Sequence, residues 1–156
     1  MQSACFFALL DALLPRPDSP PWFAWPYDPR VHLALFVHRV AGVEPGLYCL
    51  VRRPDDLPVL RAAMRGDWLW RQVGPANLPL YLLLPHDLRA AAGFVSCHQD
   101  IAADGCFALG MLANMDEVDR APWRYRRLFW ECGVIGQALY LEAEAAGFRG
   151  TGIGCF

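Results

Sequence analysis

The spacing of hydrophobic residues changes several times along the chain, and each spacing predicts a different element. Within residues 3–14 the apolar side chains recur at three- and four-residue steps, which predicts a short helix with Ser3 as its N-cap. Residues 32–40 and 47–53 are rich in β-branched and aromatic side chains and predict two strands. The turn-forming sequence AGVEPG lies between these strands, so we expect a β-hairpin.

An unbroken apolar run, LPLYLLL, occupies residues 78–84 and is closed by Pro85. Such a run predicts a strand that is buried on both faces. The sheet that contains it therefore needs a layer on each side. A shorter segment, residues 68–73, fits another strand.

Shorter helical patterns surround these strands. We expect a helix over residues 57–64, capped by Asp55 or Asp56. Residues 88–102 also have helical spacing. Residues 105–112, with sequence GCFALGML, fit a helix and a strand equally well.

The longest helical pattern starts after Pro122 and ends at Gly147, which is a natural residue to follow a helix C-terminus. Its middle is apolar on almost every side, which predicts a helix buried centrally or between subunits. Gly133 and Gly136 lower its helix propensity and predict that another backbone approaches closely there. The glycine-rich residues 150–154 follow, and their N–H groups can approach a planar or anionic ligand.

Residues 16–29 combine prolines with aromatic side chains and have no periodicity, which predicts an ordered loop. Its aromatic residues are Trp22, Phe23, Trp25 and Tyr27. They would be unfavourable in water, so we expect them to cover an edge of the core. The alternative is that they form a surface for a substrate or a second subunit.

Composition narrows the class of protein. The 156 residues fit one domain, residues 1–156, and 55% are hydrophobic, which favours an oligomer. The net charge is −2 and no residue is lysine, so a lysine Schiff base and a basic tract for nucleic acid are both excluded. The longest apolar run is too short to span a membrane, and no signal peptide is evident. These features predict a cytoplasmic protein.

Candidate polar chemistry is sparse. Six cysteines occur without a C-x-x-C pair, so we expect neither a disulfide framework nor a metal site. His98 and Asp100 follow Cys97 and predict either a proton donor beside a substrate or, as we favour, a histidine that caps a helix end. A thiol or metal protein built on Cys97 and His98 is the weakest hypothesis. We expect His38 to be a partly exposed strand histidine rather than a base.

Arginines gather at the start of the last helix. Arg124, Arg126 and Arg127 have two interpretations, a phosphate site and a solvated helix face. We favour the solvated face, with Glu131 paired to Arg127 one helical turn earlier.

The last third of the chain, YRRLFWECGVIGQALYLEAEAAGFRGTGIGCF, resembles the closing helix and flavin-side loop of the nitroreductase-like flavoproteins, in particular the SagB-type dehydrogenase branch. The matching residues are Tyr125-Arg126, Glu131-Cys132-Gly133, Gly136-Gln137, Leu139-Tyr140-Leu141, Ala143, Gly147 and Ile153-Gly154. The segments VHLALFVHRVAGVEPGLYCLVRR and SCHQDIAADG are also similar to this branch. The resemblance therefore covers most of the chain from about residue 22 onward.

This resemblance implies an α+β, nitroreductase-like fold: a central mixed or antiparallel sheet flanked by helices, with a long buried C-terminal helix. It implies an intertwined homodimer with FMN at the subunit interface and hydride transfer through flavin N5. The backbone of Gly152, Ile153 and Gly154 would lie beside the isoalloxazine ring. It identifies no catalytic residue. A nicotinamide donor and a small organic substrate complete the expected partners.

The sequence also departs from the family pattern. It begins just past the position of the usual Arg-Arg-Ser-like element that holds the FMN phosphate, and it stops soon after the Ile153-Gly154 pair. We therefore expect a domain that lacks both of the family's usual ends. The function predicted is an FMN-dependent oxidoreductase of the nitroreductase or SagB-type dehydrogenase class. The alternative is a flavin-free nitroreductase-like remnant that serves as a dimerisation or structural module.

Overall fold

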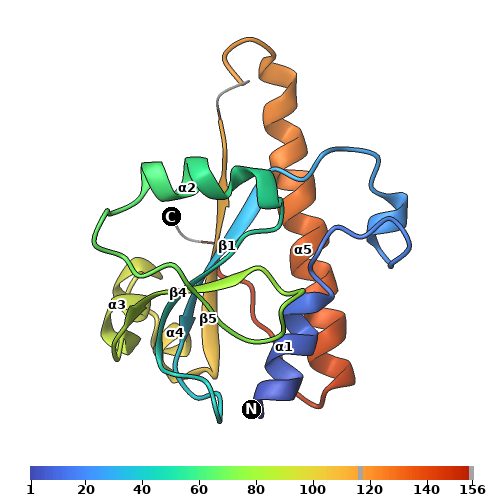
Figure 1. Ribbon diagram of the computed structural model, residues 1–156. Helices are drawn as coiled ribbons and strands as arrows, with labels where there is room; N and C mark the ends of the chain where they lie inside the picture. Colours follow the sequence, from blue (N-terminus) through green and yellow to red (C-terminus); the bar gives the residue numbers. More distant parts are fainter. Residues whose placement is uncertain (116–117, 155–156) are drawn as a thin grey trace.

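A five-stranded antiparallel sheet in the order β3-β4-β2-β1-β5 forms the centre of the molecule (Figure 1). This computed structural model describes residues 1–115 and 118–154. The strands are β1 Val31–Val37, β2 Gly46–Leu50, β3 Arg71–Gln72, β4 Leu80–Pro85 and β5 Phe107–Ala113. The α-helices are α1 Ser3–Asp11, α2 Leu57–Ala63, α3 Arg89–Val95, α4 Asp100–Asp104 and α5 Tyr125–Ala145. Three 3₁₀ turns complete the structure: η1 Trp22–Ala24, η2 Pro54–Asp56 and η3 Pro122–Arg124.

One face of the sheet is covered by α1 and α5, which lie side by side (Figure 1). Alternate residues of the strands point into this layer, so Leu33 and Leu35 of β1 are fully buried there with Phe6 of α1 and Ile135 of α5. The predicted hairpin is confirmed, because β1 pairs with β2 from Leu33↔Leu50 to Val37↔Gly46. The loop before β1 closes one edge of this core with Trp22 and, partly, Trp25, as expected. The prediction is wrong for Phe23, which is 66% exposed.

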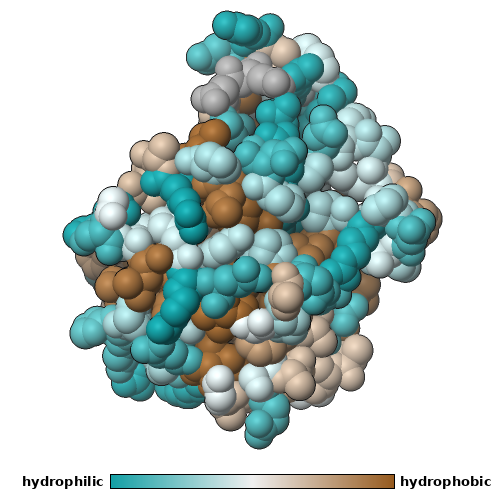
Figure 2. All heavy atoms as spheres, in the orientation of Figure 1, coloured by the Kyte–Doolittle hydropathy of each residue, from teal (hydrophilic) through white to brown (hydrophobic). Residues whose placement is uncertain are grey.

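The opposite face carries a smaller core. Cys49, Val51, Trp70 and Leu83 are buried there, and the apolar side of α2 packs against them. Strand β4 therefore has apolar contacts on both faces, as its unbroken apolar run predicts. In the orientation of Figure 1, hydrophobic side chains are visible in the middle of the molecular surface, with hydrophilic ones around them (Figure 2).

Strand β5 resolves the ambiguity of residues 105–112. Its alternate residues Phe107, Leu109 and Met111 pack on the main core, and it pairs with β1 along its full length. The core-facing residues thus recur at every second position, which is the spacing of a strand and not of a helix.

The helix predicted over residues 88–102 is divided into α3 and α4. Cys97 and His98 lie between them with φ values of 56° and 60°, in the left-handed region that a continuing right-handed helix cannot contain. The two predicted caps are not formed as expected. Gln2, not Ser3, precedes α1. Asp56 does occupy the N-cap position of α2, but its side chain bonds to His32 and Arg53 and makes no cap hydrogen bond.

Helix α5 contains 21 residues and ends at Ala145, and Gly147 follows its C-cap as predicted, with a φ of +76°. The N–H of Phe148 donates to the carbonyl of Ala143 at 2.8 Å and the N–H of Gly147 to that of Glu144 at 3.0 Å, which is a Schellman motif. The start of α5 extends beyond the end of the sheet (Figure 1). No helix in the described ranges has the length and apolar character that crossing a membrane requires.

Only one side of α5 is buried within this chain. The residues of α5 that the chain itself buries are Glu131, Ile135, Ala138 and Ala143. Large side chains on other sides are exposed: Tyr125, Phe129, Trp130, Tyr140 and Leu141. A Cβ added to Gly133 or Gly136 would meet nothing within 4 Å, so the backbone approach predicted at these glycines is not made inside the chain.

Candidate functional site

The glycine-rich segment that follows α5 is held against the helix by one tyrosine. Tyr140 lies three residues before the buried Ala143, and its hydroxyl accepts a hydrogen bond of 2.5 Å from the N–H of Gly152. Its ring lies 3.3 Å from the position that a Cβ would take on Gly150. A side chain at Gly150 would therefore crowd this ring, whereas glycine lets the loop fold onto the helix.

The other predicted loop residues keep their polar groups available. Neither Ile153 nor Gly154 has a hydrogen-bond acceptor for its N–H among the residues that the structure describes. A Cβ on Gly154 would meet nothing within 4 Å. A flat ligand could therefore approach the backbone of these two residues, whereas the N–H of Gly152 is already used by Tyr140. Cys155 and Phe156, which we expect to be buried rather than to border a substrate space, lie outside the described residues.

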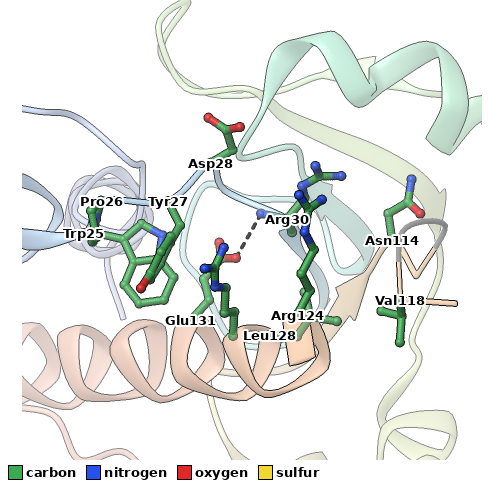
Figure 3. A pocket seen from close by; sticks show the side chains of 11 residues that line it. Trp25, Pro26, Tyr27, Asp28, Arg30, Asn114, Val118, Arg124, Leu128 and Glu131 are labelled. Atoms are coloured by element: carbon green, nitrogen blue, oxygen red, sulfur yellow. Dashed lines mark hydrogen bonds between the residues drawn. The ribbon is translucent and has the colours of Figure 1, made fainter. Parts of the chain in front are cut away.

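A second feature is a pocket of about 400 Å³ between the loop that precedes β1 and the start of α5. Its wall is formed by Trp25, Pro26, Tyr27, Asp28, Arg30, Asn114, Val118, Arg124, Arg127, Leu128 and Glu131. Figure 3 shows the side chains of Arg30 and Arg124 close together above Leu128, with Asp28 at the outer edge. None of the glycine-loop residues lines this pocket.

Glu131 is the buried carboxylate at the base of this pocket, and it is 1% exposed. It accepts hydrogen bonds from the backbone N–H of Arg30 at 2.9 Å, drawn as a dashed line in Figure 3, and of Val31 at 3.4 Å. It also forms an ion pair with the guanidinium of Arg52. The predicted pair of Glu131 with Arg127 is therefore wrong, because Glu131 points into the core.

Arg52 has no exposed side-chain surface. Its Nε donates to the carbonyl oxygen of Leu13 at 2.8 Å, and the Nη1 that pairs with Glu131 also donates to that of Val31 at 2.9 Å. Its Nη2 is buried without a hydrogen-bond partner among the described residues, and the guanidinium lies 4.6 Å from the centre of the Trp22 ring. Residues from α5, β1 and the segments after α1 thus contact one charged group that follows β2. This arrangement fixes the position of α5 against the sheet.

A second buried polar pair lies beside it. His32 is 2% exposed, and its Nδ1 accepts the backbone N–H of Arg52 at 3.2 Å, so its Nε2 carries the proton and donates to Asp56 at 3.0 Å. Burial lowers the pKa of His32 below its ordinary value. The neighbouring Asp56 raises this pKa, but by less than burial lowers it. Burial raises the pKa of Asp56, but hydrogen bonds from Arg53 and His32 hold that pKa below its ordinary value.

The cluster predicted at residues 97–100 forms no common site. Cys97 is exposed, the His98 ring lies edge-on to Phe94 at 5.2 Å, and Asp100 begins α4. His38 is half-buried, as expected, and its Nε2 bonds to the carbonyl of Ala102 at 3.0 Å. Among the described residues, no group of three metal-binding side chains occurs.

Comparison with known proteins gives one informative match. No protein-family model matches the chain, and no curated protein is similar to it in sequence. A crystal structure of a putative nitroreductase from Anabaena variabilis superposes with a TM-score of 0.72 at 17% identity, over 100% of this chain and 29% of that one. The chain therefore has a nitroreductase-like fold, as its sequence predicts, and spans less than a third of that protein's length.

Sequence reasoning missed the buried charges. Spacing to Arg127 favours a solvated position for Glu131, but Glu131 lies four residues before the buried Ile135 and therefore on the same side of the helix. His32 and Arg52 lie in strand-like segments and gave no separate signal. Both are polar residues beside apolar runs, and this position is a signal of burial.

Proposed function

We propose that this chain is part of an FMN-dependent oxidoreductase of the nitroreductase or SagB-type dehydrogenase class, acting on a small organic substrate with a nicotinamide donor. The observation that carries the proposal is the segment Gly152–Gly154. Its last two N–H groups have no acceptor within the described part of the chain, and Gly154 has open space at its Cβ position. Flavin supplies the hydride chemistry, and the protein supplies binding and orientation.

Two copies of the chain would pair as a homodimer. The exposed side of α5 presents Phe129, Trp130 and Tyr140 around Gly133 and Gly136, and these glycines leave room for another backbone. Exposed aromatic side chains around small residues are typical of a helix that packs against a partner. A homodimer that covers this side also explains why so many apolar residues occur on α5.

Flavin uptake tests the proposal directly. The purified chain, dialysed against FMN, is expected to retain a flavin absorbance band in proportion to protein, and to oxidise a nicotinamide donor when a nitroaromatic acceptor is added. Protein that stays colourless under saturating FMN would reject the proposed cofactor.

A matched pair of variants locates the flavin. Gly154→Val fills open space in the free chain, so it leaves folding unchanged, but it would clash with a ring lying on this loop. FMN affinity should fall by at least about tenfold, the loss of roughly 1.4 kcal/mol. Gly66→Val, in an exposed turn with equal free space, should bind FMN like the unmodified chain.

The alternative function is a flavin-free dimerisation module. The exposed side of α5 favours it, because this surface needs a partner whether or not flavin binds. A stable dimer that takes up no FMN would support this alternative. A monomer that binds FMN would exclude it.

A further inference from the structure

The arginine-lined pocket beside Glu131 is separate from the glycine loop, and its walls have a consistent chemistry. Three guanidiniums line it, from Arg30, Arg124 and Arg127. Two carboxylates are present as well, but Glu131 is neutralised by Arg52 from within the core. Asp28 is exposed at the outer edge of the pocket. Among the described lining residues, the three guanidiniums therefore outnumber the one carboxylate, Asp28, that Arg52 does not neutralise.

Arg127 is the side chain best placed to use that charge. Its guanidinium lies 4.1 Å from the centre of the Tyr27 ring and 4.4 Å from that of Trp123. It makes no hydrogen bond or ion pair with any residue in the described ranges. Aromatic contact restricts its motion while its N–H groups stay available in the plane of the guanidinium. Such a preorganised fork matches the two oxygens of a carboxylate or phosphate group.

The remaining wall is suited to the apolar part of a ligand. Trp25, Tyr27 and Leu128 contribute aromatic and aliphatic surface next to the guanidiniums. The volume of about 400 Å³ lies within the range of small-molecule sites. An anionic group attached to a flat ring would place its charge at Arg127 and its ring against this apolar surface.

We propose that this pocket binds a small aromatic anion, a carboxylate or phosphate carried on a planar ring, with Arg127 as the principal anion contact. The site does not depend on flavin binding, because it shares no residue with the segment Gly152–Gly154. Its ligand is held by charge-assisted hydrogen bonds and ring contact, and Arg30 and Arg124 add positive charge around the anion.

The neighbouring arginine supplies a matched control. Arg126 also lies beside an indole ring, 5.4 Å from the centre of Trp130, but it does not line the pocket. Both arginines are in the first turn of α5, so Arg126→Gln and Arg127→Gln remove the same charge from the same helix end. Only the second removes a pocket contact.

Isothermal titration of the full chain with benzoate, phenyl phosphate and inorganic phosphate tests the proposal. We expect saturable binding of benzoate or phenyl phosphate, weakened about tenfold or more by Arg127→Gln and changed less than about twofold by Arg126→Gln. Preference for one ring compound identifies the anionic group. No saturable binding of either ring compound, or equal effects of the two variants, would overturn the proposal.

A second variant covers the case in which Arg127→Gln does not fold. Arg127→Lys keeps the charge but loses the planar fork, so binding of the better ligand should weaken at least about threefold. Unchanged affinity in Arg127→Lys would overturn the assignment of Arg127 as the anion contact. Because neither measurement needs flavin, failure here is distinguishable from failure of the proposed cofactor.

Discussion

Arg52 and Glu131, 79 positions apart in the sequence, form an ion pair in the core with side-chain exposures of 0% and 2%. Arg52 follows β2 and Glu131 belongs to α5, so the pair joins the sheet to the helix that covers it. Each charge has further hydrogen bonds to backbone groups of the first third of the chain. A buried pair of this kind is sensitive to loss of one partner, because the other charge then stays in a medium of low polarity.

Glu131→Gln tests this dependence. Glutamine keeps the shape and an acceptor oxygen but leaves the Arg52 guanidinium without a counter-charge. The free energy of unfolding should fall by roughly 3–5 kcal/mol, measured by urea denaturation. Glu142→Gln, on an exposed position of the same helix, should change it by less than about 0.5 kcal/mol.

A double variant separates pairing from packing. Arg52→Met combined with Glu131→Leu removes both charges and keeps apolar volume. Its unfolding free energy should lie closer to that of the unmodified chain than that of Glu131→Gln does. A double variant that is less stable than Glu131→Gln would contradict an electrostatic cause.

Most elements of the fold could be predicted from local patterns. The hairpin of β1 and β2, the strand β4 and the end of α5 each follow from side-chain period and from Gly147. The position of the break between α3 and α4 could not, because Cys97 and His98 adopt left-handed backbone that their side chains do not favour. Tertiary contacts decide such a position, and a single sequence does not display them.

The candidate sites also combine features that the sequence predicts with features that depend on tertiary contacts. The family resemblance indicates the segment Gly152–Gly154. The hydrogen bond from Gly152 to Tyr140 is not predictable in this way, because it forms only when the loop folds back over the helix. The arginine-lined pocket needed the loop before β1 and the start of α5 to meet, about a hundred residues apart in the sequence. Because Arg127 contacts Tyr27 rather than Glu131, helical spacing alone assigned it the wrong partner.

The free energy of unfolding should decrease as pH falls, in part because His32 is protonated more readily in the unfolded chain. The pKa of His32 in the folded chain is below its ordinary value of 6.5, so the unfolded chain binds the proton first as pH falls. The contribution of neutral His32 is complete above pH 6.5 and decreases below it, by at most about 1.4 kcal/mol per pH unit. Asp56, with a pKa below 3.8, adds a further loss as pH falls below that value.

Urea denaturation at a series of pH values from about 7.5 to 5 checks this effect. His32→Gln should be less stable at neutral pH and should show a shallower decline toward acid. His38 also has a pKa lowered by burial, so part of the decline will remain. His86→Gln, at an exposed position, should retain the full slope. An unchanged slope in His32→Gln would mean that other groups cause the decline.

Tyr140→Phe should loosen the glycine loop without unfolding α5. The variant removes the acceptor for the N–H of Gly152 and keeps the ring that contacts Gly150. A hydrogen bond of this kind contributes about 0.5–1.5 kcal/mol, so exchange of the Gly152 amide should accelerate about two- to tenfold. Amide exchange measured by NMR detects the change. Tyr125→Phe, an exposed tyrosine on the same helix, should leave that amide unaffected.

Phe129→Glu tests whether the exposed side of α5 is covered by a second copy. Phe129 is 56% exposed and lies one helical turn before Gly133, so a carboxylate there would be desolvated in a helix–helix contact and would face its symmetry mate. Sedimentation velocity should show a dimer for the unmodified chain and a shift toward monomer for Phe129→Glu. Phe94→Glu, on α3 with 67% exposure, introduces the same charge away from α5 and should remain dimeric. If both variants sediment like the unmodified dimer, another surface forms the interface, and the open space at Gly133 and Gly136 then needs a different occupant.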